Sequence, residues 1–382
     1  MPQEDAVMFL TESFDTQLDD LLDRACAALE LSPTQHQTAE ARYRAIGQWL
    51  SAPGTVLARF RPEIYPQGSL RIGTTVRPFA RLEYDLDLVC ELVGLDWQQV
   101  RNPIAVLNTA EQRLREHDTY KHMLERKNRC IRVNYANEFH LDVLPGCPHP
   151  GDGTDRILVP DRKAQAWTAS NPKGYADWFE ARCALGEAVI KAIQPLPAQE
   201  PADMKATLKR IVQLLKRWRD LRYRHDPANA PISIVLTTLA GTYYSGEGSI
   251  SLALGNVLGA IVASIPRNGH RLLVLNPANA LEDLSERWDH EPAAYAAFVN
   301  GIVELHQVWQ EVQRTRGIDQ VAHALFGLFG EELTKAAVAD QARAVQTLRE
   351  HQTLGIRRSS GLLTGIAGSN VTPVRRNTFF GE

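Results

Sequence analysis

The feature that most constrains the fold is a run of nine residues, YDLDLVCEL from Tyr84, in which acidic and apolar residues alternate at the start. Side chains alternate across a β-strand, so Asp85 and Asp87 project from one face while the leucines that follow each of them pack on the other. Two carboxylates held this close repel each other, and a hard divalent cation such as Mg²⁺ resolves that repulsion. The run therefore predicts a strand with one buried apolar face and one acidic, metal-binding face.

A second alternating run, EFHLDVLP, carries Asp142 on the face opposite its apolar residues. The alternating run CIRVNY precedes it, and Ala136-Asn137 between the two predicts a hairpin turn. Aspartate is disfavoured in strands, and such conflicts with local propensity tend to mark functional sites. Three aspartates on two strands could hold two metal ions about 3.5–4 Å apart, an arrangement suited to in-line phosphoryl displacement.

Gly68 and Ser69 precede the acidic run on a predicted turn, within PQGSLRIGTTVRP. Glycine allows the backbone to approach a phosphate closely, and serine adds a hydroxyl and a backbone N–H. The dipeptide alone is compatible with an ordinary turn. Its position before the acidic pair favours a phosphate-binding role.

The remaining pattern predicts a mixed core followed by a mostly helical second half. Helices are expected at 8–30, at 33–52 after an N-cap at Ser32, and from Ile104 to about Met123. A loop rich in Pro and Gly is expected from Pro145 to Pro160. Further helices are expected at roughly 175–193, 203–224, 231–244, 250–265, 291–315 and 331–350.

The motif set resembles the DNA-polymerase-beta-like nucleotidyltransferase superfamily. Within it, QGSLRIGTTVRP, YDLDLV and FHLDVLPG resemble the bacterial cGAS/DncV-like nucleotidyltransferases of antiphage CBASS systems, relatives of cyclic GMP-AMP synthase and oligoadenylate synthase. NPKGYADWF from Asn171 and LNPANALEDLSERW from Leu275 also match. The resemblance implies an α+β fold, a mixed-sheet core plus a helical C-terminal lobe. We expect the core with its N-terminal helices at 1–185, the lobe at 186–356 and a mobile tail at 357–382.

The resemblance also implies a role for each site residue. Gln67, Gly68 and Ser69 would hold the triphosphate. Asp85 and Asp87 would bind both metal ions, and Asp142 would complete the site and help to activate the acceptor 3′-hydroxyl.

The helix DMKATLKRIVQLLKRWRDLRYR supplies a second group of expected contacts. Its Lys209 and Lys216 are seven residues apart and share a face, which by itself also fits a solvated basic surface. By resemblance Lys216 and Ser233 contact the donor phosphates, and Lys209 is a weaker match.

The implied reaction is the metal-dependent condensation of nucleoside triphosphates, ATP with or without GTP, into a cyclic di- or trinucleotide second messenger. Pyrophosphate would leave at each step, and two Mg²⁺ ions, or Mn²⁺, would serve as cofactors. One alternative is the transfer of a single nucleotide to a protein, an RNA or a small molecule. A second alternative, of another class, is an inactive nucleotide-binding scaffold.

Composition narrows the partners and the compartment. The formal net charge of −3 over 382 residues gives no overall basic field, so a long nucleic acid is not expected as a ligand. No apolar run approaches the ~18 residues of a membrane span, and the N-terminus lacks signal-peptide character. Five cysteines without a CxxC pair fit reduced thiols, so we expect a cytoplasmic protein.

Two further segments were considered as binding sites. Cys130, His140, Cys147 and His149 cluster in sequence, but their spacing matches no common zinc finger, so we expect core or surface residues there. The C-terminal tail ends in Phe379-Phe380, adjacent aromatics that could engage a regulatory partner. Loose packing of the tail on its own lobe is the alternative.

Overall fold

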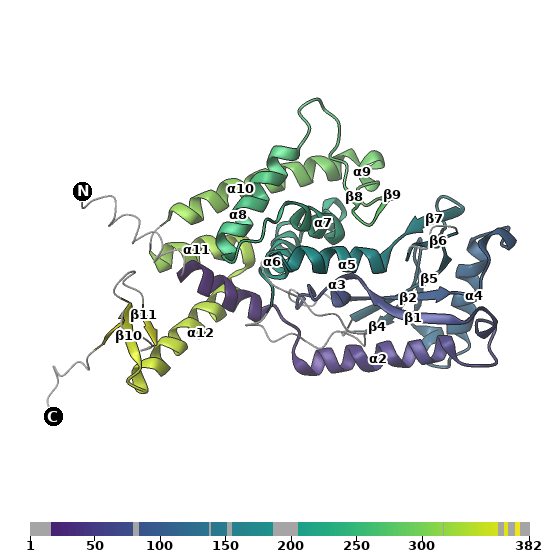
Figure 1. Cartoon of the computed structure of the whole chain (residues 1–382), viewed down its shortest axis with the longest axis horizontal. Coiled ribbons are helices and arrows are strands. Elements are labelled where there is room, and N and C mark those ends of the chain that lie inside the picture. Colours follow the sequence, from purple (N-terminus) through teal and green to yellow (C-terminus); the bar gives the residue numbers. More distant parts are fainter. Residues whose placement is uncertain are drawn as a thin grey trace.

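The computed structural model describes residues 17–78, 84–136, 139–150, 155–185, 205–315, 317–357, 363–365 and 371–374. Figure 1 shows a sheet with its covering helices at one end of the molecule and a lobe of packed helices at the other. The α+β fold expected from the sequence is confirmed, with a mixed sheet followed by a helical lobe.

The core is a single seven-stranded sheet. Its strands are β1 (Pro62–Gln67), β2 (Tyr84–Leu92), β3 (Leu124–Arg126), β4 (Ile131–Tyr135), β5 (Phe139–Pro148), β6 (Ile157–Asp161) and β7 (Ala166–Ser170). The main order is β1-β2-β5-β4-β3, with β6 pairing β5 and β7. Strands β2 and β5 are parallel and the other pairs are antiparallel, so the two aspartate-bearing strands lie side by side.

The sequence analysis found β2, β4 and β5 but not the strands at the margins. Strand β1, to which the sequence analysis assigned no structure, contains Pro62 and Pro66. It pairs only with β2, and an edge strand tolerates proline. The loop expected from Pro145 to Pro160 was wrong at both ends, because β5 continues to Pro148 and β6 begins at Ile157. The β4–β5 hairpin is confirmed by its antiparallel register, although Asn137 lies outside the described residues.

Two helices, α2 (Pro33–Ser51) and α4 (Ile104–Arg115), cover one face of the sheet. Their apolar side chains share a core with Leu86 and Leu88 of β2 and with Leu141 of β5, all of which are buried. Alternation then directs the aspartates of both strands to the opposite face. Helix α4 ends well before Met123, and a 3₁₀ turn at Tyr120–His122 follows it.

The helical lobe packs around a second and larger apolar core. It contains α5 (Pro172–Cys183), α6 (Thr207–Arg222), α7 (Ser233–Tyr243), α8 (Ile250–Ser264), α9 (Arg287–His290), α10 (Pro292–Arg314), α11 (Ile318–Phe329) and α12 (Glu331–Glu350). The sequence analysis left α11 unassigned. Glycines with positive φ, Gly317 and Gly330, bound this helix and separate it from its neighbours.

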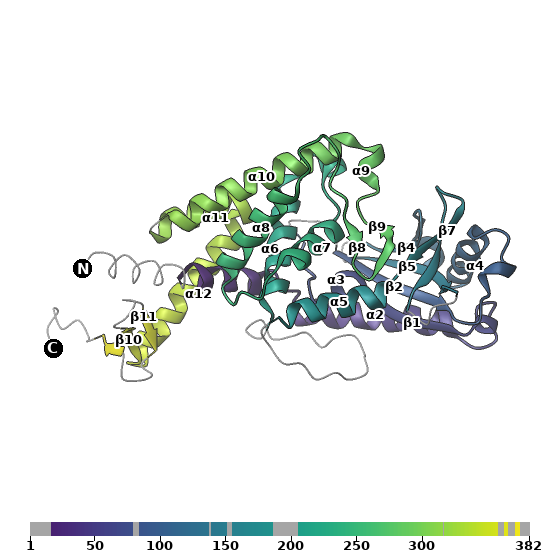
Figure 2. The same cartoon turned by 45° about the horizontal axis from the view of Figure 1, so that its top comes forward.

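The helix at 17–28 packs into the core of the lobe rather than onto the sheet. Figures 1 and 2 both place it beside α12. Arg24 forms an ion pair with Asp340 of α12 at 2.5 Å, and Gln341 donates a hydrogen bond to Asp20 at 2.7 Å. The domain boundaries expected from the sequence remain a prediction, but the apolar core joins this N-terminal helix to the C-terminal lobe.

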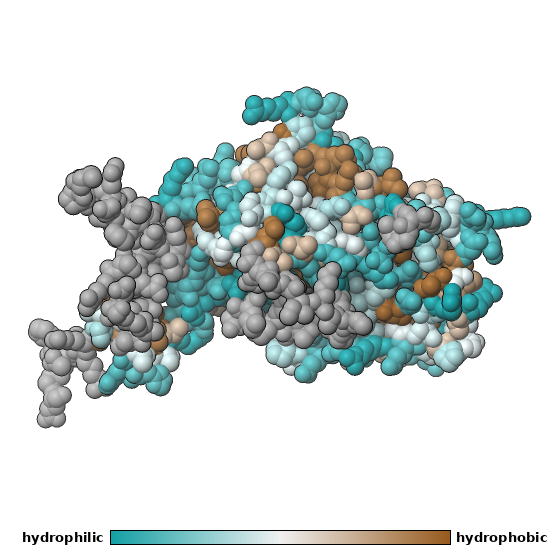
Figure 3. Space-filling model, in the orientation of Figure 1, coloured by the Kyte–Doolittle hydropathy of each residue, from teal (hydrophilic) through white to brown (hydrophobic). Residues whose placement is uncertain are grey.

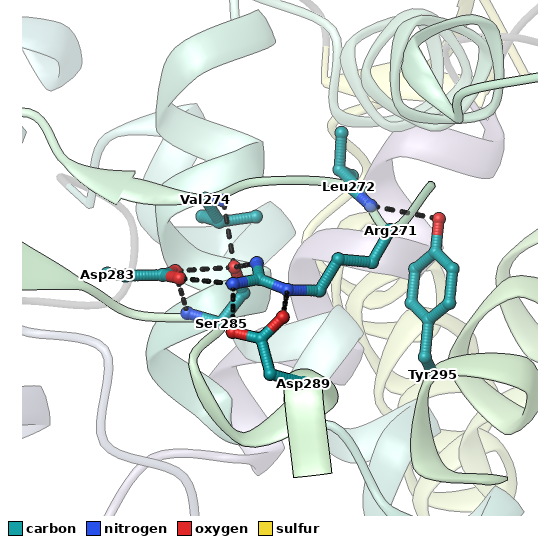
Figure 4. Close-up of polar contacts among 7 residues, drawn as sticks. All are labelled: Arg271, Leu272, Val274, Asp283, Ser285, Asp289 and Tyr295. Carbon is teal, nitrogen blue, oxygen red and sulfur yellow. Dashed lines mark hydrogen bonds and ion pairs between the residues drawn. The ribbon is translucent and has the colours of Figure 1, made fainter. Parts of the chain in front are cut away.

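A hairpin of β8 (Leu275–Asn276) and β9 (Asn279–Asp283) connects the lobe to the sheet. Figure 4 shows that Arg271 braces it from within the lobe, donating to Asp283 at 2.6 Å, to Ser285 at 2.8 Å and to Asp289. At the other side the Asn171 amide donates to the Ala278 carbonyl at 3.1 Å. The two family-like segments from Asn171 and Leu275 therefore contact each other and join the two parts of the molecule.

Part of the segment expected to be a tail forms strands. Strand β10 (Leu354–Arg357) pairs with β11 (Leu363–Gly365) and with β12 (Val371–Pro373) in a separate sheet. The sequence analysis assigned no strand from Arg357 onward. Phe379-Phe380 lies outside the described residues, so its expected partner role stays a prediction.

Within the described part of the chain, no helix combines the length and apolarity that crossing a membrane requires. The face in Figure 3 is largely hydrophilic, with its main apolar patch over the helical lobe. The exposed leucines include Leu273, just before β8, and Leu281 of β9.

The N-terminus of α2 provides a test of the fold alone. Ser32 accepts a hydrogen bond from the Gln35 N–H, and the Gln35 side chain accepts one from the Ser32 N–H, forming a capping box. Ser32→Ala should lower the free energy of unfolding by about 1 kcal/mol, measured by urea denaturation. Thr34→Ala, at an exposed neighbouring position, is the control and should have little effect. Equal losses in both variants would contradict a capping role.

Candidate active site

The turn that begins at Gly68 lies against the acidic face of the sheet. Gly68 has φ +63°, a left-handed conformation that favours glycine, and starts the single helical turn α3 (Gly68–Arg71). A Cβ at this position would lie 2.1 Å from Asp87 Oδ2. No other residue type could therefore bring this backbone so close to the Asp87 carboxylate.

A cavity of about 710 Å³ opens at this turn, between the sheet and the helical lobe. Six of the predicted site residues line it: Gly68, Ser69, Asp85, Asp87, Lys216 and Ser233. They come from α3 and β2 on one side and from α6 and α7 on the other. The structure thus gathers residues 165 positions apart in sequence, from Gly68 to Ser233, around one space.

The third aspartate sits directly beside the second. Asp142 of β5 is the register partner of Asp87 of β2, on the same face of the sheet. Arg132 of β4 donates two hydrogen bonds to the Asp142 carboxylate, both at 2.8 Å, and approaches Asp85 at 3.1 Å. Asp142 is not among the residues lining the cavity, and Arg132 holds it at the edge of the carboxylate group.

Burial and mutual repulsion set the charges of these carboxyl groups. Burial, followed by the negative charges of Asp142 and Asp85, raises the pKa of Asp87 to about 7. Burial also raises the pKa of Asp85, against the opposing effect of Arg132. An added cation would relieve this strain by favouring the ionised carboxylates.

The donor set fits a hard divalent cation. All the candidate ligands are carboxylate oxygens, the type that Mg²⁺ and Mn²⁺ prefer. Over the residues that the structure describes, no three His, Cys, Asp or Glu side chains converge in a metal-binding arrangement. Arg132 forms ion pairs with Asp85 and Asp142 and so supplies part of the positive charge that a cation would bring. For all three aspartates to bind a metal ion together, the Arg132 guanidinium must move away from Asp142.

Lys216 connects the helical lobe to the turn above the carboxylates. Its Nζ donates to the carbonyl and to the hydroxyl of Thr74, at 2.9 and 3.0 Å, and its side chain is only 6% exposed. One turn earlier on α6, Gln213 donates to the Thr75 carbonyl at 3.0 Å. Burial lowers the pKa of Lys216 to about 7. The solvated basic face considered for this helix is therefore wrong for Lys216.

Ser233 is the first residue of α7 and lines the cavity on the lobe side, as Lys216 does. The free N–H groups of a helix N-terminus favour an anion. Lys216 and Ser233, from two helices of the lobe, thus line the same cavity as the Gly68-Ser69 turn.

The structure does not bring Lys209 and Gln67 to the cavity wall. The Lys209 side chain packs over Gly73, where a Cβ would lie 3.3 Å from its Nζ. Gln67 ends β1 opposite Asp87 and precedes the first turn of α3. The nucleotide contacts expected of both residues stay predictions.

Sequence reasoning missed several cavity residues, chiefly Arg219, Asp220, Tyr223 and Arg224. Arg219 and Asp220 follow Lys216 on α6 at spacings of three and four, so helical periodicity from Lys216 could have found them, whereas Tyr223 and Arg224 lie just beyond the end of the helix. Arg132 was also missed. Its position in the alternating run, directly opposite Asp142 across the hairpin, was a usable signal.

Comparison with known proteins finds relatives along nearly the whole chain. A profile of the Second Messenger Oligonucleotide or Dinucleotide Synthetase domain matches residues 16–182. The c-di-GMP synthase of Roseivirga ehrenbergii is 35% identical, over 98% of this chain and 100% of its own length. The cyclic dinucleotide synthase CdnG of Bradyrhizobium diazoefficiens is 26% identical, over 97% of this chain and 96% of its own.

The fold is also shared with a solved structure. CdnG from Bradyrhizobium diazoefficiens, solved in complex with GTP, superposes with a TM-score of 0.69 at 24% identity, over 85% of this chain and 99% of that one. Fold and sequence together define a nucleotidyltransferase that synthesises cyclic oligonucleotides. The chain belongs to the bacterial cGAS/DncV-like nucleotidyltransferases, the family of second messenger oligonucleotide or dinucleotide synthetases.

Two glycines with the same backbone conformation test the role of the turn. Gly68→Ala and Gly54→Ala both place a Cβ at positive φ, a cost of about 1–2 kcal/mol in each case. Only at Gly68 does the new Cβ meet the Asp87 carboxylate, since nothing lies within 4 Å at Gly54. Nucleotidyl transfer should fall by about 100-fold or more in Gly68→Ala and stay near wild type in Gly54→Ala. Similar activities for the two variants would show that the close approach has no catalytic importance.

Proposed function

We propose that this enzyme condenses two GTP molecules into cyclic di-GMP and releases pyrophosphate at each of two transfer steps. Asp85, Asp87 and Asp142 would hold two Mg²⁺ ions, and the turn at Gly68-Ser69 would bind the donor triphosphate. The observation that carries the proposal is the shared cavity, which combines carboxylates from the sheet with Lys216 and Ser233 from the lobe.

Each group has a chemical task in this reaction. The bound ions would neutralise the triphosphate and polarise the attacking 3′-hydroxyl and the leaving group. Lys216 and the α7 N-terminus would offset charge on the phosphates. Asp142, beside Asp87 and away from the cavity wall, is placed to favour deprotonation of the acceptor hydroxyl once Arg132 has moved.

The sequence analysis expected ATP, with or without GTP, as the substrate; the proposal names GTP alone. It is supported by the c-di-GMP synthase to which this chain is 35% identical over nearly its full length. A cyclic dinucleotide, rather than a trinucleotide, has the same support. As in the antiphage systems that the motifs resemble, the product would act as a second messenger in defence.

Product analysis separates this function from the transfer of one nucleotide to another acceptor. The enzyme would be incubated with all four nucleoside triphosphates and Mg²⁺, and the products analysed by mass spectrometry and nuclease digestion. A cyclic product with two guanines and no free phosphate end is expected. Single-nucleotide adducts on protein, RNA or a small molecule would instead favour the alternative.

The carboxylate variants test the metal requirement in the same assay. Asp85→Asn with Asp87→Asn should lower product formation by about 10³-fold or more, because the charge that holds the ions is lost. The melting temperature should stay the same or rise, since burial already disfavours both charges. Excess chelator should abolish wild-type synthesis. Turnover by the double variant, or by wild type in chelator, would refute the metal-dependent mechanism.

Lys216 predicts a pH dependence of nucleotide binding. A bound triphosphate favours the ammonium and raises its pKa above the value of about 7 set by burial, so binding takes up a proton. Binding of GTP without divalent metal should therefore weaken as pH rises from about 6 to about 9, by at most about tenfold per pH unit. Binding would be measured by calorimetry in an Asp87→Asn background, because the Asp87 carboxyl, whose pKa is also about 7, would otherwise add to the pH dependence.

Arginine at the same position provides the control for this profile. Lys216→Arg stays charged over the range and should flatten the profile, while Lys216→Ala should weaken binding at every pH below 8. An unchanged slope in Lys216→Arg would show that another group takes up the proton.

A further inference from the structure

The cavity continues beyond the phosphate-binding end along helix α6. Arg219 and Asp220 follow Lys216 on this helix, Tyr223 caps its C-terminus, and all three line the same space. Asp220 lies four residues after Lys216, about 6 Å farther along the helix axis. In the proposed binding mode, with the triphosphate at Lys216, this part of the wall would face the nucleoside.

An acidic side chain in this position is unusual for a site that binds a polyanion. Asp220 is only 20% exposed, and burial raises its pKa, with Arg219 acting in the opposite direction. Its carboxylate could not contact phosphate without repulsion. A carboxylate retained in a substrate cavity fits a substrate group that donates hydrogen bonds.

Arg219 fixes the orientation of this carboxylate. Its Nη1 donates to Asp220 Oδ1 at 2.8 Å, and its Nε donates to the Pro231 carbonyl at 2.7 Å. Among the described residues, Asp220 Oδ2 and Arg219 Nη2 make no further hydrogen bond. The pair thus presents a carboxylate acceptor beside a guanidinium donor, held in place by the start of the segment that leads into α7.

The surrounding wall is apolar and suits a flat ring. Val76 and Pro78 of the loop after α3, and Pro227, Ala230 and Ile234 of the lobe, line the same cavity. An apolar space with a few placed polar groups is the usual form of a base-binding site.

Guanine uses this polar pattern more fully than adenine does. The Watson–Crick edge of guanine presents the donors N1–H and N2–H₂ beside the acceptor O6, whereas adenine presents the acceptor N1 beside one donor. A carboxylate accepts from N1–H and N2–H together, and a neighbouring guanidinium donates to O6. Facing adenine, the same pair would make one hydrogen bond fewer, because N6–H would donate to the carboxylate and N1 would accept from the guanidinium with no counterpart of the guanine N2 amino group.

We propose that Asp220, oriented by Arg219, selects guanine in the nucleotide bound at Lys216. This inference rests on the proposed function, because it assigns the base contact of the same nucleotide site. It makes Asp220 a specificity-determining residue and Arg219 both a positioning residue and a donor to O6.

The test compares GTP, ATP and inosine triphosphate, which lacks the N2 amino group, as substrates for wild type and for Asp220→Asn. The wild-type kcat/KM should be higher for GTP than for inosine triphosphate. In Asp220→Asn the kcat/KM for GTP should fall by about 10- to 100-fold, with a much smaller change for inosine triphosphate and ATP. Asp226→Asn, an exposed aspartate just beyond the same helix, is the matched control and should keep the wild-type preferences.

The outcomes separate this proposal from the proposed function. Wild type that forms no cyclic product from GTP would overturn the function. Wild type that makes cyclic di-GMP, with an Asp220→Asn variant that keeps the same preference for GTP over both competitors, would overturn the base contact alone. The melting temperature of Asp220→Asn shows whether the variant is folded, and equilibrium binding of GTP and inosine triphosphate shows whether it still discriminates between them. Loss of discrimination supports the proposal only if the variant is folded.

Discussion

The arrangement of the candidate active site follows from the repulsion among three carboxylates, those of Asp85, Asp87 and Asp142, on one face of the sheet. Asp87 and Asp142 are neighbours across the parallel strands β2 and β5, and Asp85 lies two residues away on the same face. Such a group is stable only with positive charge beside it. Arg132 supplies that charge from the adjacent strand, and the Gly68 turn and Lys216 approach from the other side.

Helix α6 couples this acidic face to the helical lobe. Its apolar side chains lie in the core of the lobe, while Lys216 and Gln213 hold the backbone of the loop that follows the Gly68 turn. The β8–β9 hairpin makes a second connection, through the Asn171 side chain. The cavity between these connections is lined by residues of both parts of the molecule, so a nucleotide bound there, as proposed, would contact both.

The segments with clear patterns were the ones that sequence analysis could place. The alternating runs around Asp85 and Asp142 gave both strands and the face on which the aspartates lie, and the Ser32 cap gave the start of α2. Strand β1 could not be found, because its tolerance for two prolines depends on its place at the sheet edge. The position of the Lys209 side chain could not be predicted from the sequence either, because its packing on Gly73 depends on how α6 packs against the sheet domain.

The sequence by itself determined the chemistry: three carboxylates on alternating strands, a glycine turn and a lysine-bearing helix, in a pattern that identified the family. These follow from local periodicity, which the backbone enforces over a few residues. Only the tertiary structure decided that the helix at 17–28 joins the distant lobe, that Lys209 packs on Gly73, and that Lys216 and Asp220 of α6 share one cavity with the aspartates of β2. Each of these contacts joins elements far apart along the chain or sets which face of a helix is buried. Packing of the whole apolar core fixes them, and no local pattern can.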